Sequence, residues 1–211
     1  MKTSPYFIFM FITLFSETAL GQIDSLISIR VSVGTANPRA PESFYDYWSS
    51  GIDLNVATVY NYSSGINFSP ALELSYFPFS KDRFFQKTNV MNSSVTMSGA
   101  ATIIAVLTGN FQAVFFESKQ NEKSIKAYAV GGAGVIVTYV SSSTIEYSFT
   151  SVSTVRKVNI NPCVQIGMGV SNSMTKDVDF FIETYYLYGL TTSKIMNTDF
   201  ASIRAGISVY H

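Results

Sequence analysis

The chain has 211 residues, 14 basic and 14 acidic side chains, 13% charged residues and 15% aromatic residues. Its length fits one ordinary domain, and its balanced charge excludes a net attraction to nucleic acid or to an anionic partner. The charged fraction is about half the usual share for a soluble domain, which favours a protein whose outer surface is not wetted throughout.

The first 21 residues have the pattern of an export signal. Lys2 supplies a positive start, residues 6–15 form an apolar core, and small residues at 19–21 precede a cleavage point before Gln22. This apolar run is shorter than the roughly 20 residues of a transmembrane helix, and it is the longest in the sequence. We therefore predict a cleaved signal peptide over 1–21 and a single domain over 22–211, which could span a membrane only by strands.

Eight stretches alternate between apolar residues and small or polar residues. The clearest is 158–170, in which Val158, Ile160 and Val164 share one face with the other even-numbered positions. A period of two indicates β-strand, and many such strands in one chain predict a sandwich or a barrel. In 125–138 both faces are apolar or glycine, so the orientation of that strand is left open. The expected strands are about 26–34, 50–60, 66–79, 101–116, 125–138, 158–170, 178–188 and 200–210.

The connections between these strands alternate between long and short. The long ones are 35–49, 80–100, 139–157 and 189–199, and the short ones are 61–65, 117–124 and 171–177. Outer-membrane barrels have short periplasmic turns and longer outer loops, so this asymmetry predicts periplasmic termini. Aromatic residues near the expected strand ends are typical of interfacial girdles: Tyr45, Tyr47, Trp48, Phe77, Phe79, Phe115, Phe116, Tyr185, Tyr186 and Tyr188.

The composition of the two faces decides which of them meets water. A soluble ligand-binding barrel needs an outer face rich in charged residues, whereas here the second face is mostly Gly, Ala, Ser and Asn. Small side chains suit the narrow interior of an eight-stranded barrel. Turning the few charges of that face toward lipid would cost up to roughly 2–4 kcal/mol for each Arg. We therefore predict an all-β, eight-stranded antiparallel up-and-down transmembrane barrel with its apolar face toward lipid.

Several segments resemble the outer-membrane-protein β-barrel domain family, the small eight-stranded OmpA-like or porin-like barrels of Gram-negative bacteria. The resemblance covers nearly all of the mature chain, and its motifs are loose patterns of glycine, aromatic residues and alternation. It implies a location in the outer membrane, contact with outer-membrane lipid, and insertion by the barrel-assembly machinery. The segments are FYDYWSSGIDLNVATVYNYSSGINFSPALELSYFPF, KAYAVGGAGV, NPCVQIGMGV, FFIETYYLYG and ASIRAGISVY.

The charged residues of the inner face form the candidate site. Arg30 and Arg204 lie on the first and last strands, which become neighbours when the barrel closes, and Glu183 lies on the strand beside the last one. An unpaired charge in a narrow lumen would be costly, so we expect a buried network of arginines and carboxylates that plugs the barrel. The alternative is a selectivity or gating site. The full set is Arg30, Asp53, Glu73, Gln165, Glu183 and Arg204.

Other chemistry finds little support in the sequence. The single histidine is His211, so a Ser/His/acid device and a histidine metal site are not expected. The single cysteine, Cys163, allows no internal disulfide and is expected to fill space on the inner face. Gly131, Gly132 and Gly134 lack the Lys-Ser/Thr continuation of a phosphate loop and are expected to serve packing or bending of the wall. We predict no enzyme activity, no cofactor and no metal.

Three functions remain open at this stage. The first is a structural or surface-interacting barrel with a plugged lumen, the second is a small-solute channel, and the third is a secreted lipocalin-like barrel that holds an apolar ligand. The long connections are rich in Ser, Thr and Asn. They would either contact an external ligand or simply be solvated.

Overall fold

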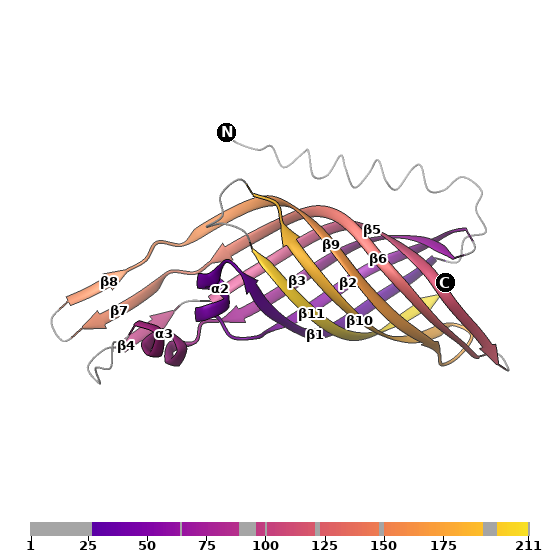
Figure 1. Ribbon diagram of the computed structural model, residues 1–211, viewed down its shortest axis with the longest axis horizontal. Helices are drawn as coiled ribbons and strands as arrows, with labels where there is room; N and C mark the ends of the chain where they lie inside the picture. Colours follow the sequence, from indigo (N-terminus) through magenta and orange to yellow (C-terminus); the bar gives the residue numbers. More distant parts are fainter. Residues whose placement is uncertain are drawn as a thin grey trace.

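The computed structural model describes residues 27–63, 65–88, 96–99, 101–120, 123–147, 150–191 and 198–210. Eight strands close into an antiparallel barrel in the order β1-β11-β10-β9-β6-β5-β3-β2 (Figure 1). Each strand therefore pairs with the barrel strands that precede and follow it in the chain, and β1 closes on β11. The signal peptide over 1–21 lies outside the described residues and stays a prediction.

All eight predicted strands are present, and the prediction of the fold class is confirmed. They contain 12 to 20 residues, more than the about 9–11 residues that a tilted strand needs to cross a bilayer. The main difference from the sequence prediction is length, because β1 continues six residues and β5 four residues past the expected ends. The barrel strands are β1 (Ile27–Ala40), β2 (Gly51–Ser63), β3 (Ile66–Pro78), β5 (Ala101–Gln120), β6 (Lys123–Val140), β9 (Lys157–Ser173), β10 (Val178–Gly189) and β11 (Asp199–Tyr210).

Long and short connections leave opposite ends of the barrel, as the sequence predicts. At the end that we call the turn end, only residues 64–65, 121–122 and 174–177 join consecutive strands. Gly65 has a φ of 92°, a left-handed conformation that glycine adopts without a Cβ penalty. The opposite end, which we call the loop end, carries the long connections, and both ends of the described chain lie at the turn end (Figure 1).

The long connections at the loop end contain more regular structure than the sequence suggests. Helix α2 (Glu42–Tyr47) follows β1, and helix α3 (Lys81–Thr88) follows β3. Strands β4 (Thr96–Gly99), β7 (Ser143–Tyr147) and β8 (Thr150–Ser153) form a separate sheet in the order β4-β7-β8, which projects beyond the barrel (Figure 1). The sequence analysis did not assign these helices and strands to the connections 35–49, 80–100 and 139–157. Segments of four or five residues are too short for their alternation to be distinctive.

The outer face of the barrel is apolar. Large apolar side chains are exposed on all eight barrel strands, among them Leu107 at 60% and Ile166 at 68%. The charged residues of the described barrel strands lie either in the lumen or near strand ends. A soluble monomer rarely exposes a contiguous apolar patch larger than a few hundred Å², so a surface of this kind is suited to lipid. No helix in the described parts of the chain is long and apolar enough to span a membrane.

The structure also orients the strand that the sequence left open. In β6 the even-numbered residues Tyr128, Val130, Ile136 and Thr138 are buried in the lumen, while Ala129 and Val135 are exposed. The glycines of this strand also differ according to the face on which they lie. A Cβ on Gly131 would meet nothing within 4 Å, whereas a Cβ on Gly132 would collide with the Asn110 side chain and one on Gly134 with the backbone of Leu107. Close packing thus accounts for two of the three glycines.

The aromatic residues do not all form an interfacial girdle. Phe77 and Tyr185 point into the lumen, with exposures of 0% and 7%. Both lie at inward positions of the strand alternation, and this position decides their side regardless of how close they are to a strand end. A second group at the loop end packs ring against ring: Tyr47, Trp48, Phe79 and Phe84. Exposed rings that remain available to an interface are Tyr45, Phe115, Phe116, Tyr186 and Tyr188.

Candidate functional site in the barrel lumen

Glu183, on β10, is the centre of the polar interior. Its Oε1 lies 2.6 Å from Arg30 Nη1, and the Tyr128 hydroxyl donates to the same oxygen at 2.6 Å. Its Oε2 accepts from the Tyr185 hydroxyl at 2.7 Å and from Arg204 Nε at 3.5 Å. Glu183 is 3% exposed. One buried carboxylate thus receives four donors from four side chains, which is the condition under which burial of a charge is tolerated.

Arg204, on β11, connects Glu183 to the two carboxylates on the other side of the lumen. Its Nη1 lies 2.8 Å from Glu73 Oε2 on β3 and 3.7 Å from Asp53 Oδ2 on β2. The Ser75 hydroxyl donates to the other oxygen of Asp53 at 3.0 Å. All of these groups are buried. The structure therefore brings Arg30, Arg204 and all three expected carboxylates into one cluster across the barrel.

Three aromatic residues complete this cluster, and the sequence analysis did not assign them to it. Tyr128 joins Arg30 to Glu183, because its hydroxyl accepts a hydrogen bond from Arg30 Nη2 at 2.7 Å and donates one to Glu183. The Arg30 guanidinium carbon lies 3.6 Å from the centre of the Phe181 ring, and that of Arg204 lies 3.9 Å from the centre of the Tyr185 ring. Such stacking favours a desolvated guanidinium. The strand alternation already placed Phe181 and Tyr185 on the face of Glu183, whereas Tyr128 lies on the strand whose orientation the sequence left open.

Gln165 belongs to a separate polar group. Its amide nitrogen donates to Asn110 Oδ1 at 2.5 Å and to Thr108 Oγ1 at 3.3 Å, and both partners lie on β5. It makes no hydrogen bond to the charged residues among the described parts of the chain. Gln165 is buried in the lumen as its strand position predicts, but the structure does not bring it into contact with the arginines and carboxylates.

An apolar layer lies in the lumen between this cluster and the loop end. Phe44 of α2 packs against Phe77 with ring centroids 5.0 Å apart, and Phe77 packs against Phe200 at 5.6 Å. The rest of the layer comes from the barrel wall and includes Cys163, which is 1% exposed. Helix α2 therefore covers the barrel mouth and inserts a ring into it. The buried members are Ala36, Phe44, Phe77, Ile104, Val106, Ile136, Cys163, Leu187 and Phe200.

Little space remains around the charged cluster. A cavity of about 10 Å³ lies beside Arg30, Glu183 and Arg204, and one of about 60 Å³ lies nearer the turn end, lined by Lys126, Asp179 and Tyr210 among others. One water molecule needs at least about 10–15 Å³. The cavity beside the charged cluster is therefore about the size of one water, and the larger cavity lies nearer the turn end.

The described residues do not meet the usual requirement of a metal site. No group of three or more His, Cys, Asp and Glu side chains among them could hold a metal ion. The single histidine, His211, lies outside the described residues. Glu183 accepts from guanidinium and phenol groups, and Glu73 and Asp53 lie against the Arg204 guanidinium, so the geometry is that of a packed ionic cluster.

Comparisons with known proteins agree on the fold. No protein-family model matches the sequence, and no characterised protein is similar to it in sequence. The crystal structure of Neisserial surface protein A (NspA) is similar, with a TM-score of 0.51 and 12% identity over 88% of this chain and 97% of that one. Ail, the attachment invasion locus protein of Yersinia pestis, gives 0.48 with 14% identity over 87% and 98%. The N-terminal barrel domain of Pseudomonas aeruginosa OprF gives 0.42 with 12% identity over 88% and 99%.

NspA, which has a TM-score of 0.51, is a small eight-stranded outer-membrane barrel. The resemblance that the sequence suggested is therefore confirmed at the level of the fold, and the chain has the fold of an outer-membrane β-barrel protein. At 12% identity the similarity to NspA extends to the fold alone, and one fold supports many functions.

Proposed function

We propose that this chain is an integral protein of the outer membrane, without catalytic activity, whose closed barrel has a structural or surface-interacting role. The observation that carries this proposal is the division of its side chains. Every barrel strand exposes large apolar side chains on its outer face, and the arginines and carboxylates in the middle of the strands are buried and paired inside. This arrangement suits a barrel surrounded by acyl chains and closed by its own interior.

The first experiment tests the membrane location. The proposal predicts that the protein pellets with the outer-membrane fraction, needs detergent for extraction, and migrates differently on gels before and after heating. A secreted lipocalin-like barrel would need its apolar side chains inside, the reverse of the arrangement described. Recovery of the folded protein in the soluble fraction without detergent would overturn the proposed location.

The second experiment separates the plugged barrel from a small-solute channel. The plugged barrel is supported by the cavity of about 10 Å³ beside the charged cluster and by the buried apolar layer of Phe44, Phe77 and Phe200 toward the loop end. We expect planar bilayers containing the purified protein to stay electrically silent, beside a porin preparation as positive control. Steady nanosiemens currents that scale with the amount of inserted protein would favour the channel instead.

The third experiment tests which end faces the outside of the cell. The sheet β4-β7-β8 and the two helices project from the loop end (Figure 1), and a surface role requires this end to be external. A cysteine at exposed Ser153 in β8 should react with a membrane-impermeant maleimide on intact cells. A cysteine at exposed Lys176 in the turn 174–177 should react only after the outer membrane is opened. The reverse pattern would contradict the proposed orientation.

A further inference from the structure

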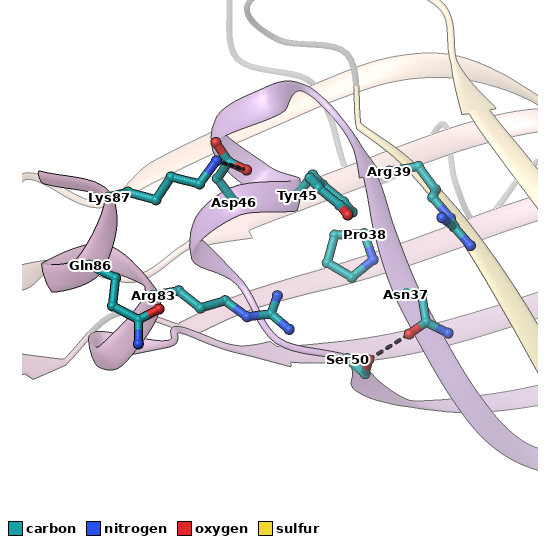
Figure 2. Close-up of a pocket in the computed structure, with 9 residues that line it drawn as sticks. All are labelled: Asn37, Pro38, Arg39, Tyr45, Asp46, Ser50, Arg83, Gln86 and Lys87. Atoms are coloured by element: carbon teal, nitrogen blue, oxygen red, sulfur yellow. Dashed lines mark hydrogen bonds and ion pairs between the residues drawn. The ribbon is translucent and has the colours of Figure 1, made fainter.

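A basic pocket lies at the loop end, beside the barrel wall. It has a volume of about 380 Å³ and is formed by the end of β1, by α2 and by α3 (Figure 2). This volume is within the range of about 300–1,000 Å³ that is usual for small-molecule sites. Its lining contains three cationic side chains and one carboxylate, so that it carries a net charge of +2. The lining residues are Asn37, Pro38, Arg39, Tyr45, Asp46, Ser50, Arg83, Gln86 and Lys87.

The pocket begins where the apolar band of the barrel ends. Asn37 follows Thr35 on the outward-facing side of β1, and Thr35 pairs across the sheet with Ile52, whose side chain is 59% exposed. The Ser50 hydroxyl donates to Asn37 Oδ1 at 2.5 Å and so closes the lower edge of the pocket (Figure 2). Two residues of strand correspond to about 7 Å. The cationic groups therefore lie just beyond the apolar surface that we assign to the bilayer.

The three cations are held in different ways. The Lys87 ammonium lies 2.9 Å from Asp46 Oδ1, and this hydrogen bond raises the pKa of Lys87, so the lysine is charged at neutral pH. The guanidinium of Arg83 donates through Nη1 to the Trp48 carbonyl at 3.2 Å and is directed toward Ser50 (Figure 2). Arg39 has neither an ion pair nor a hydrogen bond with any described residue. Figure 2 shows the Arg39 side chain directed away from Arg83, so each guanidinium retains donors for an anionic group of its own.

We propose that this pocket binds the phosphorylated sugar headgroup of a lipid in the surrounding leaflet. Arginine forks match phosphate oxygens in pairs, and the hydroxyl and amide groups of Tyr45, Ser50 and Gln86 can bind sugar hydroxyls. The position next to the apolar band allows a bound headgroup to keep its acyl chains along the barrel wall. This inference rests on the membrane location proposed above.

Binding is tested with the purified full-length protein in nonionic detergent, by native mass spectrometry. The probes are lipid A carrying both phosphates and the same lipid with both phosphates removed. The wild type should bind the phosphorylated lipid at least about tenfold more tightly, because charge-assisted hydrogen bonds are among the stronger ones. The double variant R39Q/R83Q should lose this preference. Equal affinity of the wild type for the two lipids, or an unchanged preference in R39Q/R83Q, would overturn the proposal.

A matched control removes the same charge from the other end of the barrel. Lys119 and Lys176 are exposed at the turn end, and K119Q/K176Q should bind the phosphorylated lipid as the wild type does. An equal loss in this control would mean that total charge, and not the pocket, governs binding, and would also overturn the proposal.

The remaining arms separate the lipid from other causes. Glucosamine 6-phosphate tests a soluble source of the same chemistry, and binding of this sugar as tight as that of the lipid would overturn the assignment to a lipid. A heat-induced shift in gel mobility verifies that each variant is folded. If the wild type proves soluble without detergent, the proposed location fails. If the wild type is inserted in the membrane but binds the phosphorylated and the dephosphorylated lipid equally, only the assignment of the pocket fails.

Discussion

At the scale of single residues, Glu183 is the group whose loss should matter most. It accepts from Arg30, Tyr128, Tyr185 and Arg204, and each of these side chains is itself buried. Removing Glu183 leaves the buried Arg30 guanidinium without its carboxylate in a medium of low dielectric, whereas Arg204 keeps Glu73 and Asp53. The cost therefore comes mainly from the partners that remain.

Replacing Glu183 with Gln should lower the free energy of unfolding by about 3–5 kcal/mol. The measurement is reversible urea unfolding in lipid vesicles, followed by tryptophan fluorescence. The control is Glu117→Gln, because Glu117 pairs with Lys119 and Lys126 at 3.5 and 3.9 Å near the turn end and is 37% exposed. Surface pairs contribute about 0–1 kcal/mol. Equal losses in both variants would contradict the buried cluster.

Tyr128 provides a finer test, because only one oxygen atom is removed. In Tyr128→Phe the ring stays, while the hydroxyl that joins Arg30 to Glu183 disappears. Hydrogen bonds to charged groups contribute about 1.5–3 kcal/mol, so we expect a loss of this size in the same unfolding measurement. Tyr62→Phe, at a position that is 79% exposed, should leave stability unchanged. A Tyr128→Phe protein as stable as the wild type would show that the bridge is dispensable.

At the scale of the strands, glycines leave room for the large residues of the lumen. Gly169 of β9 pairs with Tyr128 on one neighbouring strand and with Glu183 on the other. A Cβ at Gly169 would lie 2.6 Å from the Tyr128 ring and 2.7 Å from Glu183 Cγ. In the same way Phe181 pairs with Gly206, and a Cβ there would lie 2.8 Å from its ring. Most side chains of the inner face are small because the few large ones need the space inside the barrel.

This packing predicts opposite outcomes for two glycines on neighbouring strands. Gly169→Ala should destabilise the barrel by about 1–3 kcal/mol, the usual cost of overpacking, as measured by urea unfolding in vesicles. Gly131→Ala should be neutral or slightly stabilising, because a Cβ at Gly131 meets no atom within 4 Å and alanine restricts the unfolded chain. If the two variants have the same stability, the close packing of Tyr128 against β9 does not restrict the size of the side chain at position 169.

The strands and the long connections differed in how far the sequence could predict them. The barrel strands other than β6 carry their own period-two pattern, so the existence and both faces of each could be read locally. The pattern failed in β6 because glycine and alanine occupy both faces. Strands β4, β7 and β8 have four or five residues each and are stabilised by pairing with one another. The pairing of β4 with β7 joins segments that are separated by the hairpin of β5 and β6, and local alternation does not indicate such a pairing.

At the scale of the whole molecule, the direction of the apolar band decides the environment of the barrel. Leu72 is 56% exposed in the middle of β3, whereas its neighbours Ala71 and Glu73 are buried. A charge at the position of Leu72 would therefore meet acyl chains if the barrel is inserted, and water if it is soluble. The same substitution can distinguish the two environments.

Leu72→Arg should reduce the stability of the inserted barrel by up to roughly 2–4 kcal/mol, the cost of an arginine facing the bilayer midplane. The measurement is urea-dependent folding into phosphatidylcholine vesicles. Tyr62→Arg is the control, because Tyr62 lies near the turn end of β2, where a strand end leaves the apolar band. A Leu72→Arg protein that folds as well as Tyr62→Arg would mean that this face does not meet lipid.

The sequence by itself determined the two faces, the number of strands and the alternation of long and short connections, because these depend on neighbours along one strand. It also indicated which charged residues belong to the lumen. Only the tertiary structure decided how they pair. Arg204 and Glu73 are 131 positions apart, and Arg30 and Tyr128 are 98 apart. Their contacts depend on the register with which the barrel closes, and no local pattern encodes that register. The pocket at the loop end likewise exists because two helices from separate connections meet beside the end of β1.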